Sequence, residues 1–113
     1  MSTSQPLTVA EFPLTPKTAK RIVQDLATNH TGRIKLSKHT RIRMDERDIT
    51  FQQIIAVLRS NSSRFEEHPY QTECGDWKMN FEGISSGETI RVPLILRRYE
   101  DDPSVLIVTV IDV

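Results

Sequence analysis

The sequence has few of the residues that usually build a disulfide framework or an aromatic core. Its 113 residues include one cysteine, one tryptophan, two tyrosines and four phenylalanines. A single cysteine cannot form an intramolecular disulfide bond, which favours a reducing compartment, and it supplies no thiolate cluster for a metal. Because aromatic residues are scarce, aliphatic side chains must provide most of the hydrophobic core.

The sequence also lacks the features of a secreted or membrane-anchored protein. The first residues contain no basic segment followed by an apolar core, as a signal peptide would. No apolar run approaches the roughly 20 residues that a membrane-spanning helix needs. The sequence therefore predicts a cytoplasmic protein that does not contact the membrane.

Net charge is absent too, but the charges are unevenly distributed. The 15 basic and 15 acidic residues cancel, which argues against a uniformly basic nucleic-acid-binding protein. Residues 1–48 contain nine basic and five acidic residues, so this part carries +4 and the remainder carries −4. Such a distribution allows a local basic face on a neutral protein.

Three helices are predicted in the first half of the chain, and each has the same local signature. A Ser or Thr that can cap the helix precedes a segment with the residue types and spacing of a helix. These pairs are Thr15 before a helix from Pro16 to residues 29–32, Ser37 before residues 38–47, and Thr50 before a helix that stops at residues 60–63. A brief strand is expected over residues 33–36, and residues 1–14 are expected to be a disordered or loosely docked tail.

After residue 63 the apolar period changes from helical to alternating, which predicts strands. The expected strands are residues 64–68, ending before Pro69, then 77–82, 90–97 and 105–113, with turns at 83–87 and 100–103. Pro93 marks an edge or a bulge, and the apolar last strand is expected to be central and covered on both faces. Helices followed by strands predict an α+β domain, with the helices packed on one face of a mostly antiparallel sheet of four to five strands.

The helix predicted over residues 38–47 places three basic side chains on one face. His39, Arg43 and Arg47 follow one another at four-residue spacing. One imidazole and two guanidiniums in a stripe can bind a phosphate or a carboxylate. The alternative is structural: the arginines pair with nearby carboxylates or backbone carbonyls, and His39 tethers the helix to a neighbouring strand. Lys78 and Arg91, on the polar face of the sheet, can join the stripe only if the helix reaches over the sheet edge.

The order of these elements resembles a known family. The resemblance rests on Ser37-x-His39-x-x-x-Arg43-Met44-x-x-Arg47-x-Ile49-Thr50, a following apolar helix, a strand bearing Trp77, a strand opening at Gly87-Glu88, and a last strand over residues 105–110. Over roughly residues 33–111 it resembles the domain family catalogued as DUF4258. Such domains look like relatives of the RelE-type and barnase-type ribonuclease fold, and the strand half also looks like the MqsR toxins. The resemblance implies one RelE-like domain over residues 15–113.

The resemblance also implies an activity and its partners. It implies the toxin component of a bacterial type II toxin–antitoxin system, a metal-independent endoribonuclease (mRNA interferase) that needs no cofactor. Its expected partners are messenger RNA, free or on the ribosome, and an antitoxin protein that holds it inactive. The site residues carried over by matching positions are His39, Arg43, Arg47, Lys78 and Arg91.

Metal-free RNA cleavage requires a base for the 2′-hydroxyl proton, an acid for the leaving 5′-oxygen, and cations that stabilise the phosphorane. His39 can be the base or the acid, since imidazole exchanges protons near neutral pH. The motif contains no second acid–base group, for which Glu82 and His68 are the remaining candidates. That gap and the zero net charge keep open the alternative of a non-catalytic RelE-fold binding module for a partner protein or RNA.

Overall fold

The computed structural model describes residues 14–98 and 102–113. Within these residues the elements are α1 (Pro16–Asn29), a 3-10 turn (Thr31–Arg33), β1 (Ile34–Leu36), α2 (Lys38–Arg47), α3 (Phe51–Arg59), β2 (Arg64–Gln71), β3 (Trp77–Ser85), β4 (Glu88–Arg97), β5 (Ser104–Ile107) and β6 (Ile111–Asp112). The expected tail, apart from Leu14, and part of the expected turn at 100–103 lie outside the described residues.

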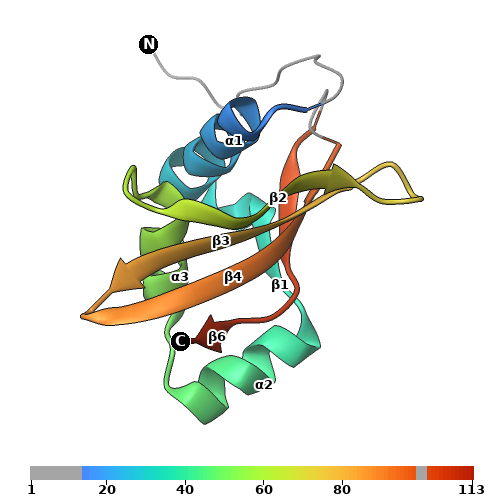
Figure 1. Ribbon diagram of the computed structural model, residues 1–113. Helices are drawn as coiled ribbons and strands as arrows, with labels where there is room; N and C mark the ends of the chain where they lie inside the picture. The colour runs from blue at the N-terminus through green and yellow to red at the C-terminus, as the bar shows by residue number, and fades with distance from the viewer. Residues whose placement is uncertain (1–13, 99–101) are drawn as a thin grey trace.

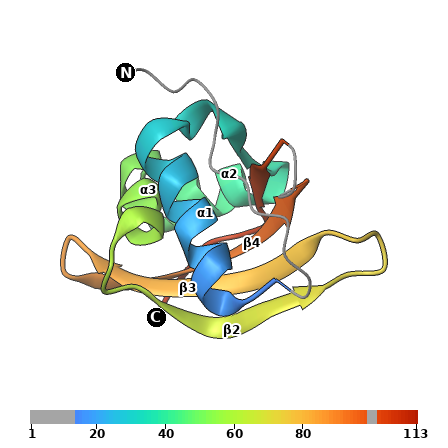
Figure 2. The same ribbon diagram turned by 90° about the horizontal axis from the view of Figure 1, so that it is seen from above.

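The strands form one mixed sheet in the order β1-β5-β4-β3-β2, with the short β6 paired to β4 beyond the end of β5. Only the β1–β5 pair is parallel among the described strands. Helices α1, α2 and α3 lie on one side of the sheet, and its other face is open (Figure 2). The predicted α+β class, with helices on one face of a mostly antiparallel sheet, is confirmed; the sheet has one short strand more than expected.

The three predicted helix caps are all formed. Each cap oxygen accepts a hydrogen bond from the backbone N–H three residues later, at 3.2 Å for Thr15, 3.0 Å for Ser37 and 3.2 Å for Thr50. Pro16 occupies the first position of α1. A backbone N–H at this position has no partner within the helix, so the missing N–H of proline costs no helical hydrogen bond. Because capping depends on neighbours in the chain, the helix starts could be predicted from local sequence.

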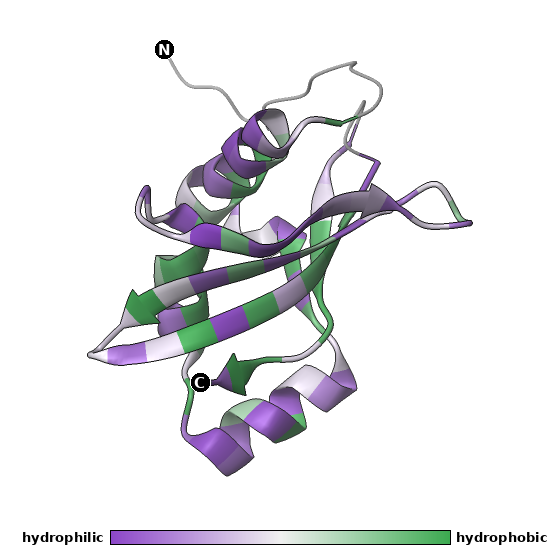
Figure 3. Cartoon of the chain, in the orientation of Figure 1, coloured by the Kyte–Doolittle hydropathy of each residue, from purple (hydrophilic) through white to green (hydrophobic). Residues whose placement is uncertain are grey.

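The core forms between the helices and the covered face of the sheet. Apolar residues alternate with polar ones along β3 and β4 (Figure 3). The residues of the predicted stripes that are completely buried are Ala19, Ile22, Val23 and Leu26 in α1, Ile54 and Leu58 in α3, Met79 and Phe81 in β3, and Ile90, Val92, Leu94 and Leu96 in β4. All of them belong to one continuous cluster, so the alternation correctly identified the covered face.

Two predicted boundaries in the strand region are wrong. Strand β2 does not end before Pro69 but continues to Gln71. It is an edge strand whose register with β3 shifts between Glu67 and Tyr70, and a proline is tolerated at such an irregularity because no ladder donor is needed there. The turn expected over 83–87 is shorter, because β3 and β4 are joined by Ser86 and Gly87 alone, both at positive φ.

The last predicted strand is interrupted rather than continuous. Between the β5 and β6 pairings, residues 108–110 lie opposite only residues 92–93 of β4, so the chain bulges by one residue. The Pro93 carbonyl accepts from Val108 N–H at 2.9 Å, so the proline ring nitrogen also faces this interruption. The bulge expected at Pro93 is therefore present. The expectation of coverage on both faces is wrong, because Ile111 and Val113 are exposed on the open face.

Gly83 allows the turn before β2 to approach β3 closely. A methyl group at Gly83 would collide with Ser63 Oγ and lie 3.2 Å from Val57 Cγ1. Ser63 Oγ is itself held by a 2.6 Å hydrogen bond to the Val57 carbonyl. We expect Gly83→Ala to lower the free energy of unfolding by about 1–3 kcal/mol, measured by urea denaturation.

Gly32→Ala is the matched control, because a methyl group there has no neighbour within 4 Å. It should change the free energy of unfolding by less than about 0.5 kcal/mol. Equal effects of the two substitutions would show that the close approach at Gly83 does not limit stability.

Candidate functional site

Hydrogen bonds fix the amino-terminal end of α2 to the end of β5. Ser37 Oγ donates to the Val108 carbonyl at 3.0 Å, and Ser37 N–H donates to the Ile107 carbonyl at 3.2 Å. Thr40, the only buried residue of α2, donates through Oγ1 to the same Ile107 carbonyl at 2.6 Å. The interruption between β5 and β6 therefore also positions α2.

The carboxyl-terminal end of α2 is held by an ion pair. Arg47 Nη1 lies 2.7 Å from Asp112 Oδ1 of β6, and Asp48 ends the helix in the left-handed conformation at φ 55°. In between, Met44 packs against the core while most other residues of α2 are exposed. The helix is thus anchored at both ends and presents most of its surface to solvent.

The basic stripe predicted on α2 is formed, and two of its members are in contact. Arg43 Nε donates to His39 Nε2 at 3.5 Å, the long end of the hydrogen-bond range, and Arg43 Nη1 lies 3.6 Å from Glu46 Oε1. The contact places the Arg43 guanidinium beside the imidazole ring of His39. Arg43 pairs with a neighbouring carboxylate, as the structural alternative expected. Arg47 pairs instead with Asp112.

Lys78 and Arg91 lie on the open face of the sheet, away from α2. In the β4–β6 register, Asp112 lies opposite the buried Ile90, whereas Ile111 lies opposite Arg91. Side chains alternate along a strand, so Asp112 with its Arg47 partner and Arg91 are on opposite sides of the sheet. Strand β6 separates α2 from β4 (Figure 1). The five predicted site residues are therefore divided between two surfaces.

The two cations on the open face differ in their surroundings. Arg91 Nε donates to Glu82 Oε2 at 2.7 Å. Lys78, opposite Tyr70 on β2 and Ile95 on β4, has no ion pair within the described residues. Lys78 therefore keeps its charge available to a ligand, while Arg91 already has a partner.

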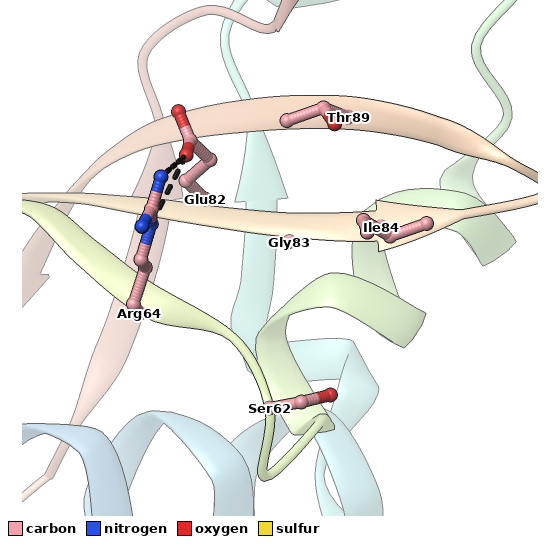
Figure 4. A pocket seen from close by; sticks show the side chains of 6 residues that line it. All are labelled: Ser62, Arg64, Glu82, Gly83, Ile84 and Thr89. Carbon is pink, nitrogen blue, oxygen red and sulfur yellow. Dashed lines mark hydrogen bonds and ion pairs between the residues drawn. The ribbon is translucent and has the colours of Figure 1, made fainter.

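Glu82 joins two arginines into a charged cluster that the sequence did not reveal. Arg64 Nη2 lies 2.7 Å and Arg64 Nε 3.2 Å from Glu82 Oε1, while Arg91 bonds to the other oxygen (Figure 4). The Glu82 side chain is only 7% exposed, whereas that of Arg64 is 78% exposed. A second carboxylate, that of Glu66, lies near enough to help raise the pKa of Arg91, so two negative charges offset the two guanidiniums.

The cluster fixes the protonation state of Glu82. The hydrogen bond from Arg91, and next that from Arg64, lowers the pKa of Glu82 below its ordinary value of 4.5, against the opposing effect of burial. The same bond to Glu82 raises the pKa of Arg91 above its ordinary range. Glu82 is therefore ionised at neutral pH and has no proton to give to a leaving group, which removes it as the general acid.

Strand register, rather than any local motif, brings this cluster together. Arg64 pairs with Glu82 across β2 and β3, and Glu82 pairs with Arg91 across β3 and β4, so the three lie in one cross-strand row. Alternation alone places Glu82 and Arg91 on one face. Arg64 could not be added from the sequence, because β2 has two register shifts and its pairing depends on where they fall.

A pocket of about 350 Å³ lies beside this cluster (Figure 4). It is lined by Ser62, Arg64, Glu82, Gly83, Ile84 and Thr89. The pairing of β2 with β3 ends at Arg64 and Glu82, while β3 continues to Ser85, so the pocket lies beside a part of β3 that has no strand neighbour on that side.

The remaining candidate groups are isolated from one another. His68, the other imidazole considered for acid–base catalysis, lies on β2 with its ring centroid 5.7 Å from that of Phe65. Cys74 is exposed in the turn before β3. Residues 14–98 and 102–113 contain neither a group of three or more His, Cys, Asp or Glu that could hold a metal ion nor a helix long and apolar enough to cross a membrane.

Comparison of the chain with models of known protein families, with curated proteins and with solved structures found no match.

The lowered pKa of Glu82 predicts how the stability of the domain depends on pH. A carboxylate whose pKa is lower in the folded state stabilises the fold above its ordinary value of 4.5, and this contribution disappears as the pH falls through the folded value. We expect Glu82→Gln to be less stable than wild type at neutral pH. The difference in unfolding free energy should shrink as the pH falls below 4.5.

The measurement is urea denaturation of both proteins across the acidic range. Glu67→Gln is the control, because Glu67 is exposed on the neighbouring edge strand β2 and makes no ion pair within the described residues. If the difference in unfolding free energy between Glu82→Gln and wild type stays constant with pH, the hydrogen bonds from Arg64 and Arg91 do not stabilise the ionised form of Glu82.

Proposed function

We propose that this domain is a metal-independent endoribonuclease and the toxin component of a bacterial type II toxin–antitoxin system. The observation that carries the proposal is the exposed contact between the His39 imidazole and the Arg43 guanidinium on α2. The resemblance of the surrounding residue pattern to the DUF4258 domains supports it. The substrate is messenger RNA, and an antitoxin protein covers the domain when it is inactive.

His39 is the general base in this proposal. Its unprotonated Nε2 takes the proton of a ribose 2′-hydroxyl, and the resulting oxygen attacks the adjacent phosphorus. The bond from phosphorus to the 5′-oxygen breaks, leaving a 2′,3′-cyclic phosphate and a 5′-oxygen that takes a proton from water. The nucleophile belongs to the substrate, so the reaction does not require a metal to generate it.

Arg43 provides the positive charge next to the base. It lies one helical turn from His39, so its guanidinium can donate to the phosphorane oxygens as negative charge develops there. The pair of Arg43 with Glu46 is long, at 3.6 Å, whereas Arg47 and Arg91 each lie 2.7 Å from a carboxylate oxygen and contribute only through their charge at a distance. Lys78 has no such partner within the described residues, and it binds a more distant phosphate of an RNA that extends onto the open face.

A second candidate function is a non-catalytic binding module for RNA or a partner protein. It is favoured by the absence of a paired acid: Glu82 is ionised between two arginines and lies on the other side of the sheet from the α2 stripe. Such a module would bind RNA through the same cations without breaking it.

RNA cleavage by the purified protein tests the nuclease proposal. We expect cleavage of single-stranded RNA in the presence of EDTA, and a loss of at least about 100-fold in rate for His39→Ala, the typical effect of removing a general base. Arg43→Ala should reduce the rate by about 100-fold, because one developing charge loses its donor. The readout is the initial rate of cleavage of a labelled oligonucleotide.

Two variants are the matched controls. Arg41→Ala removes an exposed guanidinium from another face of the same helix, and His68→Ala removes an exposed imidazole from β2. Both should cleave at the wild-type rate, and a substrate with 2′-deoxyribose at the cleaved position should be inert. The nuclease proposal fails if no cleavage appears, or if cleavage survives both His39→Ala and Arg43→Ala.

Expression in bacteria separates the two candidate functions. The nuclease should arrest growth, and His39→Ala should remove the arrest while protein levels on an immunoblot stay equal. Arrest that persists unchanged in His39→Ala, together with RNA binding but no cleavage by the purified protein, would favour the binding module.

A further inference from the structure

Exposed aliphatic side chains gather at one end of the open sheet face. Ile84 is 73% exposed, Val113 67% and Ile111 38%. Ile84 pairs with Thr89, and Val113 N–H donates to the Thr89 carbonyl at 2.9 Å, so these residues share one cross-strand row. Ile111 lies in the next row on the same face. Exposed apolar side chains that are grouped in this way are typical of a binding surface.

The pocket beside Arg64 adjoins this apolar end. Residues 83–85 of β3 lie beyond the last β2 pair, and successive residues of a strand direct their backbone groups to alternate sides. At least one of these three residues therefore points its N–H and C=O away from β4, toward the side that β2 has left. A segment in extended conformation can pair with this short edge.

Arg64 gives the pocket a charge preference. Its Nε and Nη2 both bond to one oxygen of Glu82, while Nη1 has no hydrogen-bond partner within the described part of the chain. The Arg64 side chain is 78% exposed, so a ligand in the pocket can reach this nitrogen. The Arg64 guanidinium can donate hydrogen bonds to a second carboxylate while it keeps its bonds to Glu82.

We propose that this pocket and the adjoining apolar end bind a short acidic peptide segment of a partner protein. The segment pairs with residues 83–85, places a carboxylate on Arg64 Nη1 and sets an aliphatic side chain against Ile84. The pocket volume of about 350 Å³ suits a few side-chain groups rather than a whole helix. The site is separate from α2 and does not depend on the proposed nuclease activity.

The lining of the pocket favours a peptide over RNA. None of its six lining residues is aromatic, so the pocket offers no platform on which a base can stack. Aliphatic contact combined with one available guanidinium matches an aliphatic residue next to Asp or Glu.

Selection from a random heptapeptide library displayed on phage, with the full chain as bait, tests the proposal. We expect the enriched sequences to carry Asp or Glu next to Ile, Leu or Val. A synthetic peptide with the enriched sequence, labelled with a fluorophore, gives the dissociation constant by anisotropy. Arg64→Ala and Ile84→Ser should each weaken binding at least about 10-fold.

Arg97→Ala is the matched control, because Arg97 is an exposed arginine at the other end of β4. It should bind the peptide as the wild type does. Titration of the peptide into isotopically labelled protein should shift the backbone amide signals of residues 83–85. Urea denaturation of Arg64→Ala and Ile84→Ser should show that both remain folded, since the two side chains are largely exposed.

Several results would overturn the proposal. They are enrichment of no sequence, enrichment of sequences without an acid, binding that survives both substitutions, and displacement of the peptide by a hexauridine oligonucleotide, which would identify a nucleic-acid surface. The outcome is independent of the nuclease proposal. His39→Ala should bind the peptide normally, and Arg64→Ala should cleave RNA at the wild-type rate.

Discussion

The interruption of the last strand opposite Pro93 determines where α2, the helix with the basic stripe, is attached to the sheet. Proline has no N–H to offer a neighbouring strand, and the chain bulges by one residue at that point. The Ile107 carbonyl at the end of β5 accepts a hydrogen bond from Thr40 Oγ1, and the Val108 carbonyl just beyond it accepts one from Ser37 Oγ. Beyond the bulge, β6 brings Asp112 to Arg47. The contacts at both ends of α2 thus depend on one irregularity in a strand that lies near the end of the described sequence.

This arrangement gives the domain two charged surfaces with different chemistry. On α2, the His39 imidazole and the Arg43 guanidinium are in contact on the exposed surface of the helix, where solvent and a flexible substrate can reach them. On the open sheet face, the carboxylate of Glu82 is enclosed by arginines and stays ionised. The first surface can exchange a proton, whereas the second is suited to recognition. A neutral protein can therefore carry two local groups of basic side chains that the net charge does not reveal.

What could be predicted from the sequence was mostly local. Thr15, Ser37 and Thr50 cap helices through neighbours three residues away, and the apolar spacing of α1, α3, β3 and β4 identified the core. Tertiary pairing decided the rest: the path of β2 through Pro69, the break in the last strand, and the separation of Lys78 and Arg91 from the α2 stripe. The contact of Arg64 with Glu82 depends on strand register, which alternation alone does not specify.

The distance in sequence between α2 and its anchors has a consequence for the synthesis of the protein. Ser37 is bound to Val108, 71 residues later, and β1 pairs in parallel with β5, so both contacts close very long loops. A nascent chain can form α1 and α3 early, but α2 has neither anchor until residues 104–112 have left the ribosome. The helix that carries His39 and Arg43 is therefore positioned among the last elements, and a partly translated chain lacks an ordered version of it.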